Sequence, residues 1–174
     1  ARDDAWGGSD FTFGDVTLRK PKHDNHELLG KTKFAGCLGV MKDVKRNKYT
    51  QNAKIEADCS VDGKEVYKLK STANTANWWY DHRISLIDAK TFADYRTEYF
   101  KGGKHIKTID RSWAPANLDD PRASYWGYWY GKTNTTGHET MAFIPSTITK
   151  VNHKYKAKNL WSTRTLKKMP KKIK

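Results

Sequence analysis

Cysteine is scarce in this chain, long apolar runs are missing, and the common catalytic signatures are absent. Only two cysteines occur among the 174 residues. No apolar run approaches the ~20 residues that a membrane-spanning helix needs, so we expect no transmembrane segment. The sequence has no Gly-x-Ser-x-Gly elbow, no Walker loop and no Gly-x-Gly-x-x-Gly turn, the signatures of many hydrolases and nucleotide-binding enzymes. We therefore expect a non-enzymatic protein without a cofactor.

Aromatic residues are abundant instead. Apolar residues make up only 37% of the chain, but aromatic residues reach 13% and include seven tryptophans. This aromatic content argues against disorder. The length fits one domain that is large enough to bury a core. Composition therefore predicts a single folded domain.

The net charge is +14, from 33 Lys and Arg against 19 Asp and Glu. It implies an anionic neighbour, such as nucleic acid, acidic lipid headgroups, anionic glycans or an acidic protein. The basic residues are scattered except in residues 167–174, which we interpret as a solvated basic tail rather than an electrostatic anchor. Aromatic and basic residues interleave over residues 95–101, as in proteins that bind single-stranded nucleic acid. Because these aromatics follow strand alternation, core packing explains them better, and we expect no nucleic-acid partner.

Apolar and polar residues alternate in many short segments, which is the pattern of half-buried strands. Asp62-Gly63 and Gly102-Gly103 are the strongest hairpin signals between them. The only helix candidates, residues 88–93 and 116–120, are about one turn long. The fold class is therefore mainly β, an antiparallel sheet with few short helices. Strands are expected at residues 11–18, 28–40, 53–61, 65–71, 78–87, 95–100, 105–113, 125–130, 139–144 and 146–151.

Two clusters have side chains that could carry chemistry, and each also has a simpler explanation. His23, Asp24 and His26 have the donor atoms of a metal site, but their spacing without a helix favours an exposed polar turn. Trp78-Trp-Tyr-Asp-His82 could form a sugar platform or an acid–base pair. In a strand these residues alternate between two faces, which favours core packing. We therefore expect neither a metal site nor a catalytic residue.

Cys37 and Cys59 lie in two short strand-like runs. A disulfide between them would close a loop and stabilise the fold by ~3 kcal/mol in the chain-entropy model. An even cysteine count in an exported protein favours the bridge, and two buried free thiols are the alternative. Neither cysteine has a histidine at metal-ligand spacing, so a zinc site is not expected.

The most regular part of the chain is the ribbon from Ala123 to Leu166, which has aromatic alternating strands, a Gly-containing turn and a short closing segment. Four blocks, the last of them in this ribbon, follow one another along the chain: Gly8-Ser-Asp-Phe-Thr-Phe-Gly-Asp-Val-Thr-Leu18, Val61-Asp-Gly-Lys-Glu-Val-Tyr67, Ile87 to Thr108, and Asn134-Thr-Thr-Gly-His-Glu-Thr-Met141 with Leu160-Trp-Ser-Thr-Arg-Thr-Leu166. In this order the blocks resemble those of the LolA-like outer-membrane lipoprotein-sorting proteins. The chain begins just before a block that lies inside the family's domain, so we expect either a fragment or a reduced barrel that closes against a partner.

This resemblance implies a curved antiparallel sheet, or incomplete β-barrel, formed by one domain over residues 1–166 that lacks N-terminal strands of the family. It also implies a non-enzymatic, periplasmic carrier or binding protein, exported after loss of a signal peptide. Its ligand would be a lipid or lipoprotein acyl chain, and anionic lipid headgroups or an acidic protein would face the basic surface. The aromatic candidates for the wall of the acyl-chain cavity are Phe11, Phe13, Trp79, Phe100, Trp126 and Phe143. Parity alone does not say which face of each strand points inward.

A structural role is the alternative to a carrier. An unclosed sheet leaves edge strands to which a partner strand can add. In this interpretation the protein is a basic accessory subunit that docks onto a larger acidic assembly through its sheet edge and aromatic face.

Overall fold

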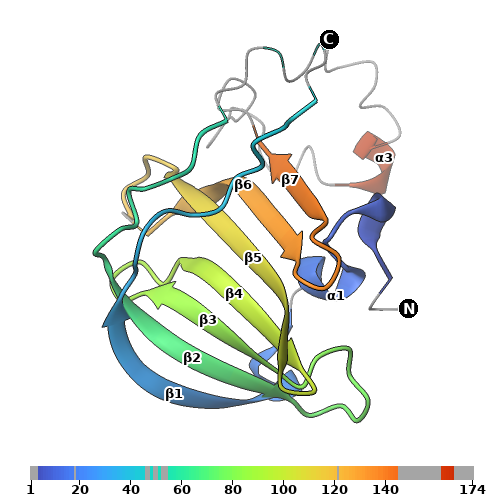
Figure 1. Ribbon diagram of the computed structural model, residues 1–174. Coiled ribbons are helices and arrows are strands. Elements are labelled where there is room, and N and C mark those ends of the chain that lie inside the picture. Colours follow the sequence, from blue (N-terminus) through green and yellow to red (C-terminus); the bar gives the residue numbers. More distant parts are fainter. Residues whose placement is uncertain are drawn as a thin grey trace.

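The computed structural model describes residues 4–17, 19–45, 48, 51, 55–120, 122–144 and 162–166. Its main element is a seven-stranded antiparallel sheet, in which each strand pairs with the next one along the chain (Figure 1). The expected mainly β, antiparallel fold is confirmed. The strands are β1 (Asp24–Lys33), β2 (Glu65–Ala73), β3 (His82–Asp88), β4 (Asp94–Lys101), β5 (Lys104–Pro115), β6 (Ser124–Thr133) and β7 (Glu139–Phe143).

Short connections explain why consecutive strands are neighbours. Gly102 and Gly103 join β4 to β5, and both have positive φ angles, 55° and 73°, which a two-residue hairpin of this kind requires. The expected hairpin there is confirmed. Asp62-Gly63 also forms a turn, but it lies before β2 and does not join two strands of the sheet.

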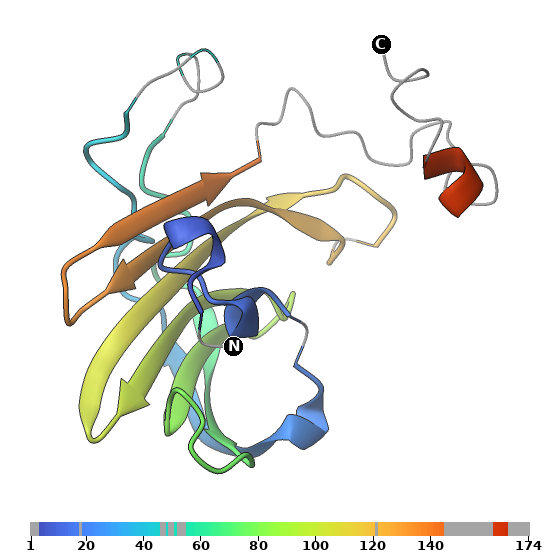
Figure 2. The same ribbon diagram turned by 90° about the vertical axis from the view of Figure 1, so that its right-hand side faces the viewer.

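The sheet is strongly curved, and the N-terminal segment runs inside the curve (Figure 2). Within the described residues, β1 and β7 each pair with one strand only, so the sheet is not closed into a barrel. The N-terminal segment contains the 3-10 turn η1 (Trp6–Gly8), the helical turn α1 (Phe13–Val16) and the 3-10 turn η2 (Pro21–His23). The concave face of the sheet is therefore covered by a segment that belongs to no strand.

The expectation of a strand at residues 11–18 is wrong. Residues 13–16 form α1, because Thr12 and Asp15 cap the start of the helix reciprocally. The backbone N–H of Asp15 donates to the Thr12 hydroxyl at 3.2 Å, and the backbone N–H of Thr12 donates to the Asp15 carboxylate at 2.7 Å. The apolar alternation of this block is therefore not that of a strand, and its residues include a short helical turn that packs on the sheet.

On the convex side, residues 34–45 and 55–64 lie outside the strands and pack over the sheet. Phe34, Leu38 and Val61 are buried there against Val66, Tyr95, Tyr128 and Tyr130 of the sheet. Tyr130 leaves no room for a side chain at Gly39, where a Cβ atom would lie 2.4 Å from the tyrosine ring.

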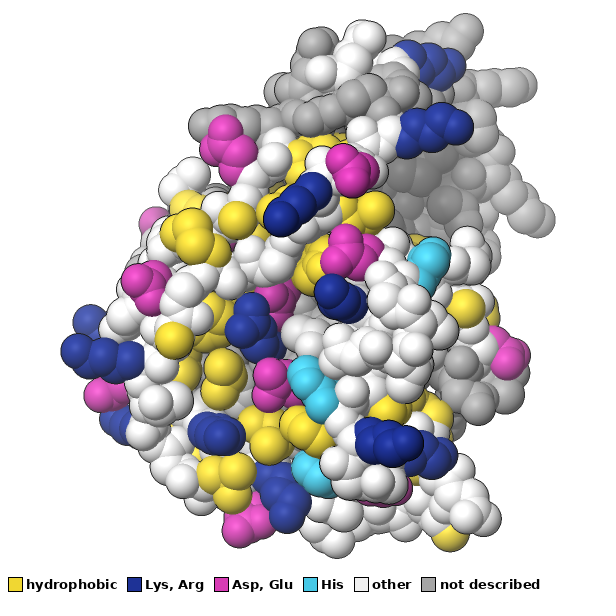
Figure 3. Space-filling model, viewed as in Figure 1, with side chains coloured by type: hydrophobic (Ala, Val, Ile, Leu, Met, Phe, Trp, Pro, Cys, Tyr) yellow, Lys and Arg dark blue, Asp and Glu magenta, His cyan; other side chains and the backbone are white. Residues whose placement is uncertain are grey.

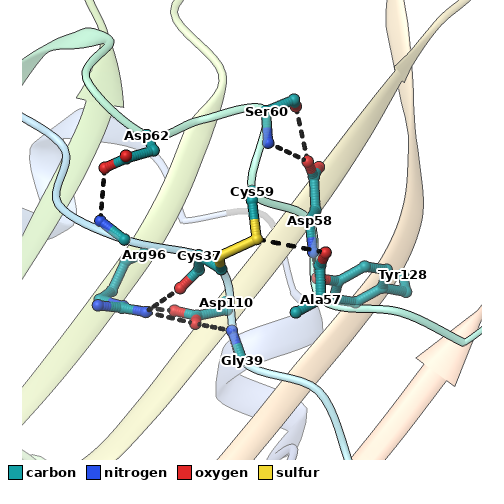
Figure 4. Close-up of a disulfide and its surroundings, with 11 residues drawn as sticks. Cys37, Gly39, Ala57, Asp58, Cys59, Ser60, Asp62, Arg96, Asp110 and Tyr128 are labelled. Atoms are coloured by element: carbon teal, nitrogen blue, oxygen red, sulfur yellow. Dashed lines mark hydrogen bonds and ion pairs between the residues drawn. A yellow bond between two sulfur atoms is a disulfide. The ribbon is translucent and has the colours of Figure 1, made fainter.

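A disulfide between Cys37 and Cys59 joins the two arms of this convex layer (Figure 4). Below it, Arg96 and Asp110 form a bidentate ion pair with two hydrogen bonds of 2.7 Å, and Asp110 also accepts the backbone N–H of Gly39 at 2.6 Å. The layer is thus fixed to the sheet by polar contacts as well as by apolar packing.

Other expected elements differ in detail. The strand expected at residues 28–40 ends at Lys33, and residues 55–61 form no strand, although the backbones of residues 34–38 and 58–64 bond to each other. Residues 78–81 are a loop before β3. The histidine motif at residues 23–26 enters β1 instead of forming an exposed turn.

The two helices expected from the sequence are also absent, because residues 88–93 and 116–120 contain no helix. The expected strand at 146–151 and the basic tail at 167–174 lie outside the described residues, and the end of the closing segment is the helical turn α3 (Thr163–Leu166).

The surface seen in Figure 3 shows Lys and Arg side chains scattered among acidic and hydrophobic ones. The high positive charge therefore does not form a single basic patch on this face. Among the described residues, no helix is long and apolar enough to cross a membrane.

Candidate functional site

A cavity of about 560 Å³ lies between the N-terminal segment and the concave face of the sheet. Small-molecule sites commonly have volumes of about 300–1,000 Å³. The cavity combines large apolar side chains with three arginines, Arg19, Arg83 and Arg111. The apolar side chains are those of Trp6, Phe11, Val16, Trp113, Trp126 and Trp129.

Asp10 ties the N-terminal segment to the hairpin of β6 and β7. Its buried carboxylate accepts hydrogen bonds from the hydroxyls of Thr133 at 2.5 Å and Thr140 at 2.7 Å, and it lies 2.7 Å from Nδ1 of His138. Two of the sequence blocks that carry the family resemblance, around residues 8–18 and 134–141, therefore meet at this carboxylate.

Lys107 provides a second anchor beneath α1. Its ammonium lies 2.5 Å from the carboxylate of Asp15, whose side chain has no exposed area. The same ammonium donates to the backbone carbonyl of Asp10 at 3.2 Å and lies 4.2 Å from the centre of the Trp79 ring. Burial lowers the pKa of Lys107 from its usual value, against the opposing effect of the Asp15 charge. This buried ion pair fixes the position of α1 over the sheet.

Phe11 fills the space between these two anchors. Its side chain is buried and packs edge-on against Trp129, with ring centres 5.7 Å apart. It can lie this close to the sheet because residue 131 is a glycine, where a Cβ atom would approach the Phe11 ring to 2.8 Å. The N-terminal segment therefore forms a close-packed wall of the cavity.

The three arginines are held in place by carboxylates. Asp24 at the start of β1 accepts two hydrogen bonds from Arg19, at 2.7 and 2.9 Å, and one from Arg83 at 3.2 Å. The hydrogen bond with Asp24 is the main cause of the raised pKa of Arg19. Arg111 pairs with Asp94 at 3.0 Å and lies 4.5 Å from the centre of the Trp129 ring. The cavity thus has charged groups at fixed positions beside its aromatic surface.

The six aromatic candidates expected from the sequence lie in different places. Phe11 and Trp126 both line the cavity. Trp79 does not contribute to its lining but stacks on Tyr99 in the same concave cluster, with ring centres 4.8 Å apart. Phe13 lies in α1 with 46% of its area exposed.

The remaining two candidates lie away from the cavity. Phe100 follows the concave residue Tyr99 in β4 and is stacked between the rings of His82 and His105, at 4.8 and 5.0 Å. Phe143 packs against the convex cluster. Four of the six candidates therefore share the concave side or its N-terminal segment, and Phe100 and Phe143 do not.

A bulge in β6 explains why the sequence did not identify Trp113 and Trp129 as cavity residues. Trp126 and Trp129 differ in parity, yet both line the cavity, because the register between β5 and β6 shifts between Ser112 and Trp113. The shift inserts an extra residue in β6 at Gly127, and such a bulge reverses the facing of everything beyond it. Alternation alone therefore could not assign Trp113 and Trp129, and the isolated glycine at residue 127 was the sequence signal of the bulge.

Comparison with known proteins adds evidence on the fold. The chain matches no protein-family model and no curated protein sequence. A solved domain from Vibrio parahaemolyticus, described as an outer membrane lipoprotein-sorting protein, matches 87% of this chain with a TM-score of 0.58 and 15% sequence identity. The fold is LolA-like. This confirms the family resemblance at the level of the fold.

A second solved structure with a similar fold comes from Desulfovibrio piger. This DUF1329-family protein matches 95% of the chain with a TM-score of 0.56 and 11% identity. The chain spans about half of both solved proteins, 54% and 56% of their lengths.

Proposed function

We propose that this protein is a non-enzymatic carrier or binding protein for a lipid or lipoprotein acyl chain, working in the periplasm of the bacterial cell envelope. The observation that carries the proposal is the aromatic cavity of about 560 Å³ on the concave side of a LolA-like sheet. Burial of an acyl chain there is favourable by about 0.8 kcal/mol for each methylene removed from water, and it requires no catalytic group.

The apolar lining explains how such a ligand is held. Trp113, Trp126 and Trp129 come from neighbouring strands, β5 and β6, and the Trp126 and Trp129 rings lie 5.5 Å apart. Large aromatic side chains of this kind supply most of the contact area in ligand sites. The basic surface supports approach to anionic headgroups through long-range attraction.

A neutral fluorescent probe, N-phenyl-1-naphthylamine, tests the proposal. We expect the purified protein to bind the probe and palmitate to displace it. The Trp126→Ala variant should weaken probe binding about tenfold, because it removes a large apolar wall residue. Phe100→Ala is the matched control, since Phe100 is an aromatic residue on the opposite face, and its affinity should stay within twofold of the wild type. Absence of probe binding by the folded wild-type protein would refute the proposal.

The alternative role, a basic accessory subunit of an acidic assembly, is supported by the edge strand β1. Leu28 and Leu29 in this strand are 61% and 43% exposed, and Lys31 and Lys33 follow them. An exposed apolar edge with adjacent lysines suits an added partner strand with acidic side chains. Light scattering after size-exclusion chromatography separates the two roles, because a carrier should be monomeric. Self-association that Leu28→Glu abolishes would favour the subunit.

A further inference from the structure

The charged groups around the cavity are unequal in number. Each carboxylate there is paired with at least one cation, and one cation is left in excess. A site with this imbalance attracts an anion, and a ligand with one negative charge would neutralise it. Of the residues that line the cavity, three are cations, Arg19, Arg83 and Arg111, and two are carboxylates, Asp15 and Asp94.

Arg83 is the cation with the weakest pairing. It makes one hydrogen bond of 3.2 Å to Asp24, and it shares that carboxylate with Arg19, which holds it at 2.7 and 2.9 Å. The side chain of Arg83 is also the most accessible of the three cavity arginines, at 22% exposed against 10% for Arg19 and 7% for Arg111. Because a guanidinium has five N–H donors, Arg83 retains most of its capacity to donate.

Two hydrogen-bond donors without a partner at the cavity also favour an anionic ligand. Nε of Arg83 and Nε1 of Trp129 are both buried and have no hydrogen-bond partner among the described residues. A buried donor without a partner costs free energy that an acceptor group can recover. Both residues line the cavity, so an acceptor group bound there has these two donors in its surroundings.

We propose, on the basis of the carrier function proposed above, that the preferred ligand is an anionic amphiphile whose single carboxylate or phosphate head binds Arg83. The planar guanidinium suits both heads, because its parallel N–H groups match two oxygens of either anion. The alkyl chain of the ligand then lies along Trp113 and Trp126. The protein thus selects its ligand by the negative charge of the head as well as by the apolar chain.

Displacement of N-phenyl-1-naphthylamine by matched ligands tests this selection. Palmitate, hexadecyl phosphate and hexadecanol have the same chain length, and only the first two are anions. We expect both anions to bind at least tenfold more tightly than hexadecanol. Inorganic phosphate and acetate, which supply the heads alone, should displace the probe only at concentrations at least a hundredfold higher.

The outcomes distinguish the two proposals. Equal affinity for hexadecanol and both anions would overturn the anionic preference and leave the carrier function intact. Failure of all three amphiphiles to bind would overturn both proposals. Binding of inorganic phosphate as tight as that of hexadecyl phosphate would identify a small-anion site and refute the amphiphile. A preference for only one of the two anions would support the proposal and identify the head.

Arg83→Met identifies the residue responsible. This variant should reduce the preference for the anions to below threefold, with hexadecanol affinity within twofold of the wild type. The control is Arg122→Met, which removes the same charge from an exposed pair with Asp120 and should keep the tenfold preference. An unchanged preference in folded Arg83→Met would contradict the assignment. The wild-type comparison needs no variant, so it tests the anionic preference even where Arg83→Met does not fold.

Discussion

At the scale of single residues, the absence of a side chain at Gly131 allows the N-terminal segment to pack. A Cβ atom at this position would lie 2.8 Å from the Phe11 ring and 3.2 Å from the Cβ of Asp10. Neither neighbour can retreat easily, because Phe11 packs on Trp129 and Asp10 is bound by Thr133. The cavity wall therefore depends on a strand position that carries no side chain.

We expect Gly131→Ala to lower the free energy of unfolding by about 1–3 kcal/mol, as overpacking in a closed site does. The variant should also bind N-phenyl-1-naphthylamine more weakly, because Phe11 is displaced. Urea unfolding and probe titration measure the two effects. Gly127→Ala in the same strand is the control, since its new Cβ would lie 3.7 Å from the nearest atom, an ordinary contact. Equal stability of both variants would contradict the close packing.

The sequence predicted the pairing of the two cysteines from their number and residue type. The even pair of cysteines was interpreted as a possible disulfide, and the structure joins Cys37 to Cys59. Alternation could not identify the face of Phe100 or Phe143, because the pairings of β1 with β2, β3 with β4, β4 with β5 and β5 with β6 each contain a register shift. Every such shift exchanges the two faces of a strand, and parity counted along the chain does not detect it.

At the scale of elements, α1 is held on the sheet by one buried ion pair. The Lys107 side chain is 6% exposed and that of Asp15 is fully buried. A buried pair is not a strong source of stability by itself, but loss of one partner leaves an uncompensated charge in the interior. The contact between α1 and β5 should therefore respond sharply to removal of the lysine.

Lys107→Met should reduce the free energy of unfolding by about 3–5 kcal/mol, because Asp15 stays buried without its cation. Lys132→Met is the matched control, since it removes the same group from a partly exposed pair with Glu139, at 3.5 Å. The control should cost less than about 1 kcal/mol. Thermal and urea unfolding measure both variants. A loss below 1 kcal/mol for Lys107→Met would show that the pair does not anchor α1.

Element-level predictions were best in the middle of the chain. The hairpin of β4 and β5 was located from Gly102-Gly103, because only glycines suit that turn readily. The segment at residues 11–18 was predicted as a strand, and its capping box, Thr12 with Asp15, was the signal that could have corrected this. Four residues are too few for a helical period to emerge from apolar alternation, so tertiary contacts decide the structure there.

At the scale of the whole molecule, the sheet separates two layers with different tasks. The convex layer, residues 34–45 and 55–64, is joined by the disulfide and packs on Tyr128 and Tyr130. The concave layer is the N-terminal segment with the cavity. Since the two layers lie on opposite faces, we expect changes in the convex layer to lower the free energy of unfolding and to leave ligand affinity unchanged.

Replacement of both Cys37 and Cys59 by serine tests this separation. The bridge spans 22 residues, and its loss should lower the free energy of unfolding by about 3 kcal/mol. At temperatures where the variant remains folded, affinity for N-phenyl-1-naphthylamine should stay within twofold of the wild type. A tenfold loss of affinity in the folded variant would show that the convex layer also shapes the cavity.

The anchoring of Asp10 affects the order in which parts of the chain fold. Its carboxylate bonds to Thr133 and Thr140, which are 123 and 130 residues further along the chain. Contacts at such separations form slowly, because the entropy cost of closing a long loop comes before the contact can stabilise it. The segment around Asp10 is therefore synthesised well before the hairpin of β6 and β7 that holds it. A nascent chain that stops short of Thr140 lacks one of the two hydroxyls that hold Asp10, so the position of the N-terminal segment over the sheet is not yet fixed.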